Sequence, residues 1–217
     1  MGSQFIALGW RDGCKTHQFC SCGGGSRCHL VIHSASVRLP PVRVQPLADE
    51  HCSAQVKRMF RAIAPDGNVE PFYRVLARKP AALRAYLQLG AALSANDSEL
   101  SEKLKVLADV RVSICNGGEY CTVAYSNAAR RLGVSEAQIE ALREPGGRRN
   151  PTLFNPAEQA VLRFTDELTS NSGNIDDSDL DDLARHFTET QIVELVLAIA
   201  TANWTNRVTD GLRTPLP

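Results

Sequence analysis

The chain has 217 residues, the length of one domain or of one domain with a tail. Lysine plus arginine equals aspartate plus glutamate at 24 each, so the formal net charge is zero, which argues against nucleic acid or an anionic membrane as the main partner. No stretch approaches the roughly 20 apolar residues that a membrane-spanning helix needs.

The first 48 residues differ in composition from the rest of the chain. They are rich in glycine, serine, cysteine and basic residues, and Asp12 is their single acidic residue. Pro40, Pro41 and Pro46 then exclude a helix at the end of this stretch. We therefore predict a flexible tail over residues 1–48 and a helical domain over residues 49–217. The scarcity of acidic residues weakly resembles an organelle transit peptide, and otherwise we expect a cytoplasmic protein.

Four cysteines gather in this tail, and they raise the question of a metal site. Cys14, Cys20, Cys22 and Cys28 lie near His17, His29 and His33. Their spacing, C-x5-C-x-C-x5-C, matches no common structural zinc site. We expect thiols without a structural role here, and neither a metal nor another cofactor in the protein.

After residue 48 nearly every segment has the apolar spacing of a helix. Residues 54–63 place Val56, Phe60 and Ile63 on one face, and Pro80 begins the next helix at its favoured first position. A third helix is predicted from about Glu99 to Ile114. The sequence "NGG" then interrupts the pattern before a fourth helix over about residues 118–131.

The second half of the chain is marked by helix caps. Ser135 with Gln138 forms a capping box, Asn155 precedes a proline at a first helical turn, and Thr188 with Gln191 begins the last helix, which we expect Gly211 to end. The middle of that helix, "IVELVLAIA", is apolar nearly all round and is typical of a core helix. The sequence predicts an all-α fold of about seven or eight helices.

The segment "NGGEYCTVAYS", residues 116–126, is the candidate active site. Cys121 lies in the first turn of the predicted fourth helix, where free N–H groups and the helix dipole favour a thiolate. We therefore expect a pKa below the usual value of about 8.5. The alternative is a buried cysteine that acts as a small hydrophobic residue.

The stretch "LKVLADVRVSICNGGEYCTVAYSNAARRLGVS" resembles the carboxymuconolactone decarboxylase and alkylhydroperoxidase D-like (AhpD-like) family. "IVELVLAIATANWTNRVTDGLRTPLP" is similar to the final helix of its peroxidase-related branch. The resemblance covers roughly residues 55–217. It implies an AhpD-like helical bundle, a homo-oligomer, a small-molecule substrate, and a thiol oxidoreductase of the peroxidase or peroxiredoxin type with an external thiol as reductant.

The family motif is Cys-x-Tyr-Cys with a histidine four residues on and a glutamate about three helical turns upstream. Cys121 falls on the second cysteine and Tyr120 on the tyrosine. Gly118, Tyr125 and Val106 stand at the positions of the first cysteine, the histidine and the glutamate. The resemblance therefore implies Cys121 as the reactive thiol of a weakened enzyme, in which a cysteine placed at 118 would restore the pair.

Several residues are candidates to replace the missing groups. Cys115 could pair with Cys121 across the Asn-Gly turn, or it packs in the core. Tyr125 and Glu119 are candidates for acid-base roles, with Tyr120 and Gly118 beside them at the substrate. Asn203, Asn206 and Arg207 form a polar stripe on the last helix that faces either a substrate pocket or an intersubunit seam.

Three functions stay open from the sequence. The first is a thiol oxidoreductase acting on peroxides through Cys121. The second is a non-redox enzyme like carboxymuconolactone decarboxylase, with a small carboxylic or lactone substrate. The third is a non-catalytic oligomeric scaffold.

Overall fold

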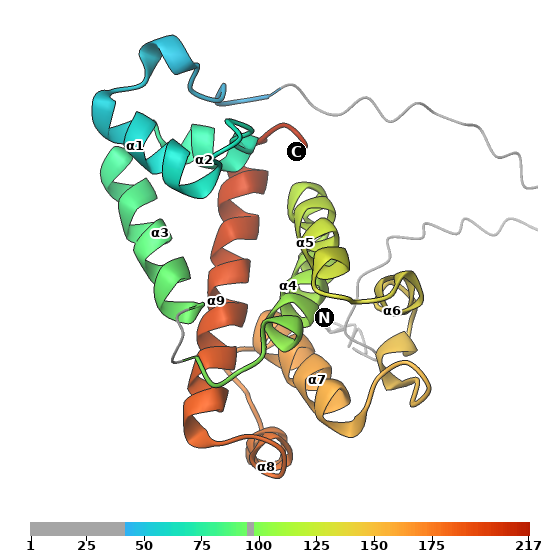
Figure 1. Ribbon diagram of the computed structural model, residues 1–217. Coiled ribbons are helices and arrows are strands. Elements are labelled where there is room, and N and C mark those ends of the chain that lie inside the picture. The colour runs from blue at the N-terminus through green and yellow to red at the C-terminus, as the bar shows by residue number, and fades with distance from the viewer. Residues whose placement is uncertain (1–41, 95–97) are drawn as a thin grey trace, which may run out of the picture.

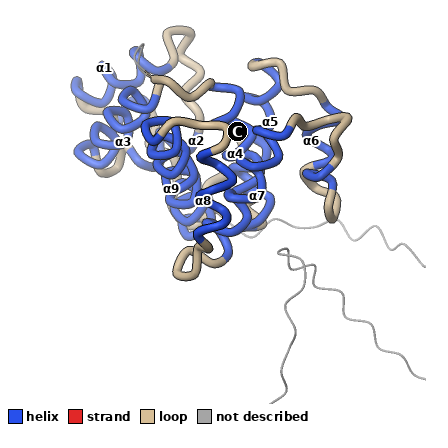
Figure 2. Tube along the Cα trace, turned by 90° about the horizontal axis from the view of Figure 1, so that it is seen from below, coloured by secondary structure: helices blue, strands red, loops and turns tan. Residues whose placement is uncertain are grey.

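The computed structural model describes residues 42–94 and 98–217, and every regular element within them is a helix (Figures 1 and 2). The α-helices are α1 (Ala54–Ile63), α2 (Pro71–Leu76), α3 (Pro80–Leu93), α4 (Glu102–Asn116), α5 (Glu119–Arg131), α6 (Glu136–Ala141), α7 (Pro156–Ser170), α8 (Asp177–Ala184) and α9 (Glu189–Leu212), with 3-10 turns η1 (Asp49–His51) and η2 (Gly147–Arg149). The predicted all-α fold is confirmed. The described part holds one helix more than expected, because α2 has only six residues, too few for its buried Phe72, Val75 and Leu76 to stand out as a helical pattern.

The helix starts follow the predicted caps closely. Capping boxes begin three helices at Ser135 with Gln138, Asn155 with Glu158, and Thr188 with Gln191. Two predicted boundaries were wrong. Helix α4 starts at Glu102, because the Ser101 side chain accepts the N–H of Leu104. Helix α9 continues through Gly211, and Arg213 takes the left-handed cap conformation with φ 49°.

Helix α9 is the axis of the fold, as its apolar sequence predicts. Helices α3, α4, α5, α7 and α8 all pack against it (Figure 1). Its inner face buries Leu195, Ala198, Ile199 and Ala202. Among the described residues, none of the helices is both long and apolar enough to cross a membrane.

The interior consists of three hydrophobic clusters that meet at one side chain. The first joins α1, α2 and α3 to the start of α5, the second joins α4, α7, α8 and α9, and the third joins α4, α5, α6 and α7. Tyr125 on α5 packs against all three. Tyr125, which the sequence predicts to act in the site, is thus also the side chain at which the three clusters meet.

A buried lysine and a glutamate anchor α9 to the loop that precedes α4. The Glu194 carboxylate accepts hydrogen bonds from the N–H groups of Glu99 and Leu100, at 2.9 and 3.1 Å, and from the Ser98 hydroxyl at 2.7 Å. Lys105, 5% exposed, lies 3.5 Å from it. Burial alone would raise the pKa of Glu194, but these hydrogen bonds and the lysine lower it to about 2.

Most of the predicted tail, with its four cysteines, lies outside the described residues. The part that is described, 42–48, already bonds to the helical domain. The N–H of Val44 donates to the carbonyl of Leu212 at 3.3 Å, and that of Leu47 donates to the carbonyl of Arg74 at 3.1 Å. Within the described ranges, no cluster of histidine, cysteine and acidic side chains is arranged to hold a metal ion.

Replacing Glu194 by Gln is expected to lower the free energy of unfolding by about 1.5–3 kcal/mol, the usual worth of hydrogen bonds to a charged group. The lowered pKa sets the pH dependence. The folded state holds the carboxylate ionised better than the unfolded state, so the stabilisation is complete above about pH 4.5 and is lost as the pH falls toward 2. Urea unfolding across this range measures the difference.

The exposed Glu144 provides the control for this experiment. Glu144→Gln should leave stability nearly unchanged at every pH. A gap between wild type and Glu194→Gln that stays the same from neutral to acid pH would contradict the assignment.

Candidate functional site

The candidate site begins at the turn that joins α4 to α5. Gly117 adopts φ 68° and ψ 21°, a left-handed conformation that glycine enters without a steric penalty. The N–H of Gly118 then returns to the carbonyl of Ser113 at 3.0 Å. The "NGG" sequence thereby ends one helix and starts the next, and places Cys121 in the first turn of α5, as predicted.

Cys121 is buried, and its thiol is held by α9. The residue is 1% exposed, and its Sγ lies 3.3 Å from the hydroxyl oxygen of Thr209. Burial, with the charges of Asp210 and Asp109, raises the pKa of Cys121 to about 12, although the bond to Thr209 acts in the opposite direction. The expectation of a lowered pKa is therefore wrong, because the loss of hydration outweighs the favourable helix N-terminus.

Tyr125 stands at the position expected for the family histidine, with the hydroxyl groups of Tyr86 and Thr205 close to it. Burial, and then the charge of Asp109, raise the pKa of Tyr125 well above its usual value. Burial likewise raises the pKa of Tyr86 on α3. The hydroxyl of Thr205 on α9 donates to the carbonyl of Thr201 at 2.9 Å and lies near both phenols, where it partly opposes the rise in their pKa values.

Asp109 on α4 is the acidic member of this group, and the sequence analysis missed it. Burial raises the pKa of Asp109 to about 8; the charge of Glu102 adds to the shift and Lys105 opposes it. Asp109 lies one helical turn after Val106, where the family has its glutamate, and therefore on the same side of α4. A carboxylate among the apolar residues of "KVLADVRV" was the available signal.

Gly118 stands where the family has its first cysteine, and Asn206 of α9 fills the space beside it. A Cβ added at Gly118 would lie 2.0 Å from Oδ1 of Asn206. Asn206 is 1% exposed and is held by bonds from its Nδ2 to the hydroxyl of Ser113 and to the carbonyl of Ala202, at 3.2 and 2.8 Å. A cysteine at 118 therefore requires Asn206 to move, which the expectation of a restored resolving thiol at this position did not take into account.

Cys115 faces away from Cys121. Its Sγ lies 3.3 Å from Oδ1 of Asp166 on α7, whereas Cys121 contacts α9. Asp166 also pairs with Arg111 at 2.5 Å and with Arg148. The Cys115 thiol lies against α7 and the Cys121 thiol against α9, so the proposed disulfide between them is not formed.

The predicted polar stripe of α9 is mostly engaged within the protein. Asn203 accepts from Asn116 at 3.0 Å and from the exposed Arg207 at 2.9 Å, and it donates to Thr169 at 3.2 Å. Together with the bonds of Asn206, these contacts join α9 to α4 and α7. The positions of Asn203, Asn206 and Arg207 are thus accounted for by contacts within the chain, without a substrate or a second subunit.

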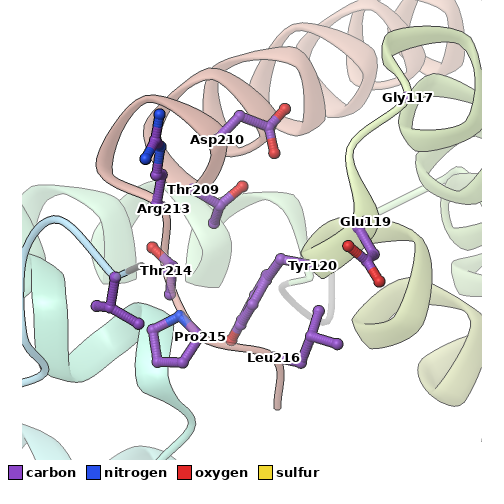
Figure 3. A pocket seen from close by; sticks show the side chains of 10 residues that line it. Gly117, Glu119, Tyr120, Thr209, Asp210, Arg213, Thr214, Pro215 and Leu216 are labelled. Carbon is purple, nitrogen blue, oxygen red and sulfur yellow. The ribbon is translucent and has the colours of Figure 1, made fainter. Parts of the chain in front are cut away.

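A cavity of about 410 Å³ opens beside the start of α5 (Figure 3). The end of α9 and the following tail form one wall and the start of α5 the other, with lining residues Val42, Gly117, Glu119, Tyr120, Thr209, Asp210, Arg213, Thr214, Pro215 and Leu216. Cys121 is not among them, but its bonding partner Thr209 and its chain neighbour Tyr120 are. A small molecule in the cavity would therefore be separated from the sulfur by these two side chains.

Glu119 and Tyr120, the two residues before Cys121, have different surroundings. Glu119 is exposed at the cavity, as expected of a first-turn acid. The Tyr120 hydroxyl accepts the N–H of Phe72 at 3.2 Å and lies 3.4 Å from the Glu70 carboxylate. Tyr120 thus ties α5 to the start of α2, which is a structural contact.

A family model for the carboxymuconolactone decarboxylase family matches residues 80–167, the region that contains this turn, Asp109 and Cys121. This match, with the solved structures described below, supports a carboxymuconolactone decarboxylase/AhpD-like assignment. The family model ends within α7, so the final helix α9 lies outside the match.

Similar proteins agree with this assignment. Uncharacterized protein YdfG of Bacillus subtilis (strain 168) is 28% identical over 116 residues, which are 53% of this chain and 77% of YdfG. A solved structure from Agrobacterium tumefaciens, of unknown function and assigned as a candidate antioxidant-defence protein AhpD, is 27% identical with a TM-score of 0.59, over 65% of this chain and 94% of that one. An uncharacterized peroxidase-related protein from Silicibacter sp. TM1040 is 25% identical with a TM-score of 0.67, over 82% and 90%.

The contact between Gly118 and Asn206 can be tested directly. Gly118→Ala is expected to lower the free energy of unfolding by about 1–3 kcal/mol, the usual cost of forcing extra volume into a packed site. Combined with Asn206→Ala, it should cost clearly less than the sum of the two single changes, because the clash is then absent. Urea unfolding of the four proteins of this cycle gives the coupling.

Gly90 in α3 is the matched control, since a Cβ there meets nothing within 4 Å. Gly90→Ala should be neutral or should stabilise the protein by up to about 1 kcal/mol. Additive effects of Gly118→Ala and Asn206→Ala would rule out the steric account.

Proposed function

We propose that this protein is a slow thiol oxidoreductase that reduces small peroxides, with Cys121 as the reactive thiol and Asp109 as the proton acceptor. The observation that carries the proposal is the convergence of Asp109, Tyr125 and Cys121 between α4, α5 and α9 in a member of the AhpD-like family. Asp109 is near enough for its charge to act on both Cys121 and Tyr125. A carboxyl with a pKa of about 8 is ionised in an appreciable fraction near neutral pH, as a general base must be.

The chemistry balances with one oxidant and one reductant. The sulfur of Cys121 attacks the terminal peroxide oxygen and the O–O bond breaks. The sulfenic acid Cys–SOH forms, and the alcohol or water leaves with the proton taken from the thiol. An external thiol then attacks the sulfenic acid and releases water. A second external thiol reduces the mixed disulfide, because the Cys115 thiol lies against Asp166 of α7 and Gly118 offers no sulfur.

The burial of the sulfur limits both rate and substrate size. A thiol with a pKa of about 12 is almost entirely protonated at neutral pH, so deprotonation limits the reaction. The cavity reaches the sulfur only past Thr209 and Tyr120. We therefore expect hydrogen peroxide and short organic hydroperoxides to react, and bulky ones to be excluded.

The pH profile of peroxide consumption with a dithiol reductant tests the role of Asp109. If Asp109 takes the proton, the wild-type rate rises about tenfold per pH unit and levels off above about pH 8, where Asp109 is fully ionised. Asp109→Asn should then be slower by about 10²–10⁴ at this pH, and its rate should climb on toward the pKa of Cys121. Cys121→Ser should abolish the activity.

Asp210→Asn is the matched control, because the Asp210 charge also raises the pKa of Cys121. Removing that charge should make the thiol easier to ionise and leave the inflection near pH 8 in place. If Asp109→Asn behaves like Asp210→Asn and becomes faster, then Asp109 acts only through its charge and is not the proton acceptor.

One observation favours a second candidate, the non-redox enzyme on a small carboxylic or lactone substrate. Asp109, Tyr86 and Tyr125 offer an acid-base group around Thr205 that needs no thiol. This candidate predicts that Cys121→Ser keeps the activity on a small lactone while Asp109→Asn loses it. The same pair of variants therefore separates the two functions.

A further inference from the structure

Helix α9 ends with a carboxylate that the helix itself disfavours. Asp210 lies in the last turn, where the negative end of the helix dipole favours basic residues, and this turn has none. Burial raises the pKa of Asp210, and no hydrogen bond or nearby charge among the described residues opposes the rise. A side chain that breaks a local rule without compensation is expected at a functional site rather than at a structural one.

The side chain of Asp210 reaches across to the start of α5. A Cβ added at Gly118 would lie 3.3 Å from its Oδ2, and Asp210 and the exposed Glu119 both line the cavity of about 410 Å³ (Figure 3). Arg213 is the single basic side chain in the described lining of this cavity. The ion pairs within the described part of the chain involve none of these three charged groups. Two carboxylates therefore face the cavity against one guanidinium, which favours a cationic ligand.

The remaining lining suits a short carbon chain and a hydrogen-bond donor. Val42, Pro215 and Leu216 contribute apolar surface. Thr214, which also lines the cavity, is 8% exposed, and its Oγ1 has no hydrogen-bond partner in the described part of the chain. An ammonium group carries three donors and no acceptor, so it can bind carboxylates and a hydroxyl oxygen together. The lining therefore fits a small amine.

We propose that this cavity receives the external reductant, and that the reductant is a small aminothiol, a thiol that carries an ammonium group. The ammonium would lie between Glu119 and Asp210. The thiol would extend past Thr209 toward Cys121, whose sulfur is 3.3 Å from the Thr209 hydroxyl. A thiol with a carboxylate would be repelled by the same two acidic side chains. This inference rests on the function proposed above and adds the chemical class of its second substrate.

The thiol group of this reductant has a defined task. Once Cys121 is a sulfenic acid, the sulfur of the aminothiol attacks the Cys121 sulfur and the S–O bond breaks. The hydroxide that leaves combines with the proton of the attacking thiol as water. A second aminothiol then attacks the reductant sulfur of the mixed disulfide, which returns Cys121 to its thiol and releases the oxidised aminothiol as a disulfide.

Reduction of the preformed sulfenic acid in the full-length protein isolates this step. The protein is oxidised with hydrogen peroxide, and dimedone labelling of the peptide that contains Cys121 reports the sulfenic acid that remains at each time. Its loss is followed with cysteamine, 2-mercaptoethanol or 3-mercaptopropionate, which are similar in size and carry a positive, no and a negative charge. The ratio of the cysteamine rate to the mercaptopropionate rate is compared between protein variants, because this comparison cancels the intrinsic reactivity of each thiol.

Glu119→Gln tests the charge of the cavity without altering the reactive thiol, because the pKa of Cys121 responds to other carboxylates. It should lower the ratio about three- to tenfold at low salt, as expected for one unit charge within about 10 Å of each thiol in water. Arg213→Gln should raise the ratio, because it removes the opposing charge. Glu144→Gln, exposed and outside the cavity lining, should leave the ratio unchanged.

The possible results separate this inference from the function on which it rests. A ratio that falls in Glu119→Gln and rises in Arg213→Gln supports the aminothiol. The same ratio in the wild type and in both variants, with a sulfenic acid that forms and is reduced, overturns the inference and leaves the oxidoreductase standing. A wild-type protein whose Cys121 yields no dimedone adduct after peroxide contradicts the oxidoreductase function, and the inference falls with it.

Discussion

The packing of Tyr125 is the constraint on which the rest of the site depends. This side chain replaces the histidine of the family motif and touches all three hydrophobic clusters. A phenol can do this because most of its surface is apolar and only a single hydroxyl is polar, which lies near Thr205. The site therefore lies against the core, and partial burial governs its proton chemistry.

Burial also decides the state of the thiol. The first turn of a helix favours a thiolate, but Cys121 is enclosed by α9 and shares its environment with two carboxylates. Both effects act against the charged form, and the pKa rises instead of falling. Among the described side chains near the thiol, Asp109 has a pKa close to neutrality, and we therefore propose it as the proton acceptor.

Side chains of helix α9 lie beside two positions at which this chain departs from the family motif, Gly118 and Tyr125. Asn206 occupies the space in front of Gly118, and Thr205 lies near the tyrosine at position 125. The loss of the first cysteine and of the histidine is thus matched by polar side chains on a helix that lies more than 70 residues further along the chain. Restoring the family groups one at a time would meet side chains that now fill their places.

The local features of the fold could be read from the sequence. Capping boxes at Ser135, Asn155 and Thr188 determine helix starts through bonds between residues three apart, and the apolar period identifies α9 as the core helix. The motif around Tyr120 and Cys121 likewise identified the family and the turn. These inferences succeed because the interactions involved are formed within one or two turns of chain.

Tertiary structure alone decided the chemistry of the site. Whether Cys121 is acidic or inert depends on how deeply α9 covers it, and whether Cys115 can reach it depends on which helix Cys115 faces. The clash at Gly118 with Asn206, and the grouping of Asp109 with Tyr86 and Tyr125, arise between segments far apart in sequence. Desolvation and steric exclusion are properties of packed neighbours, so no pattern within the motif could have revealed them.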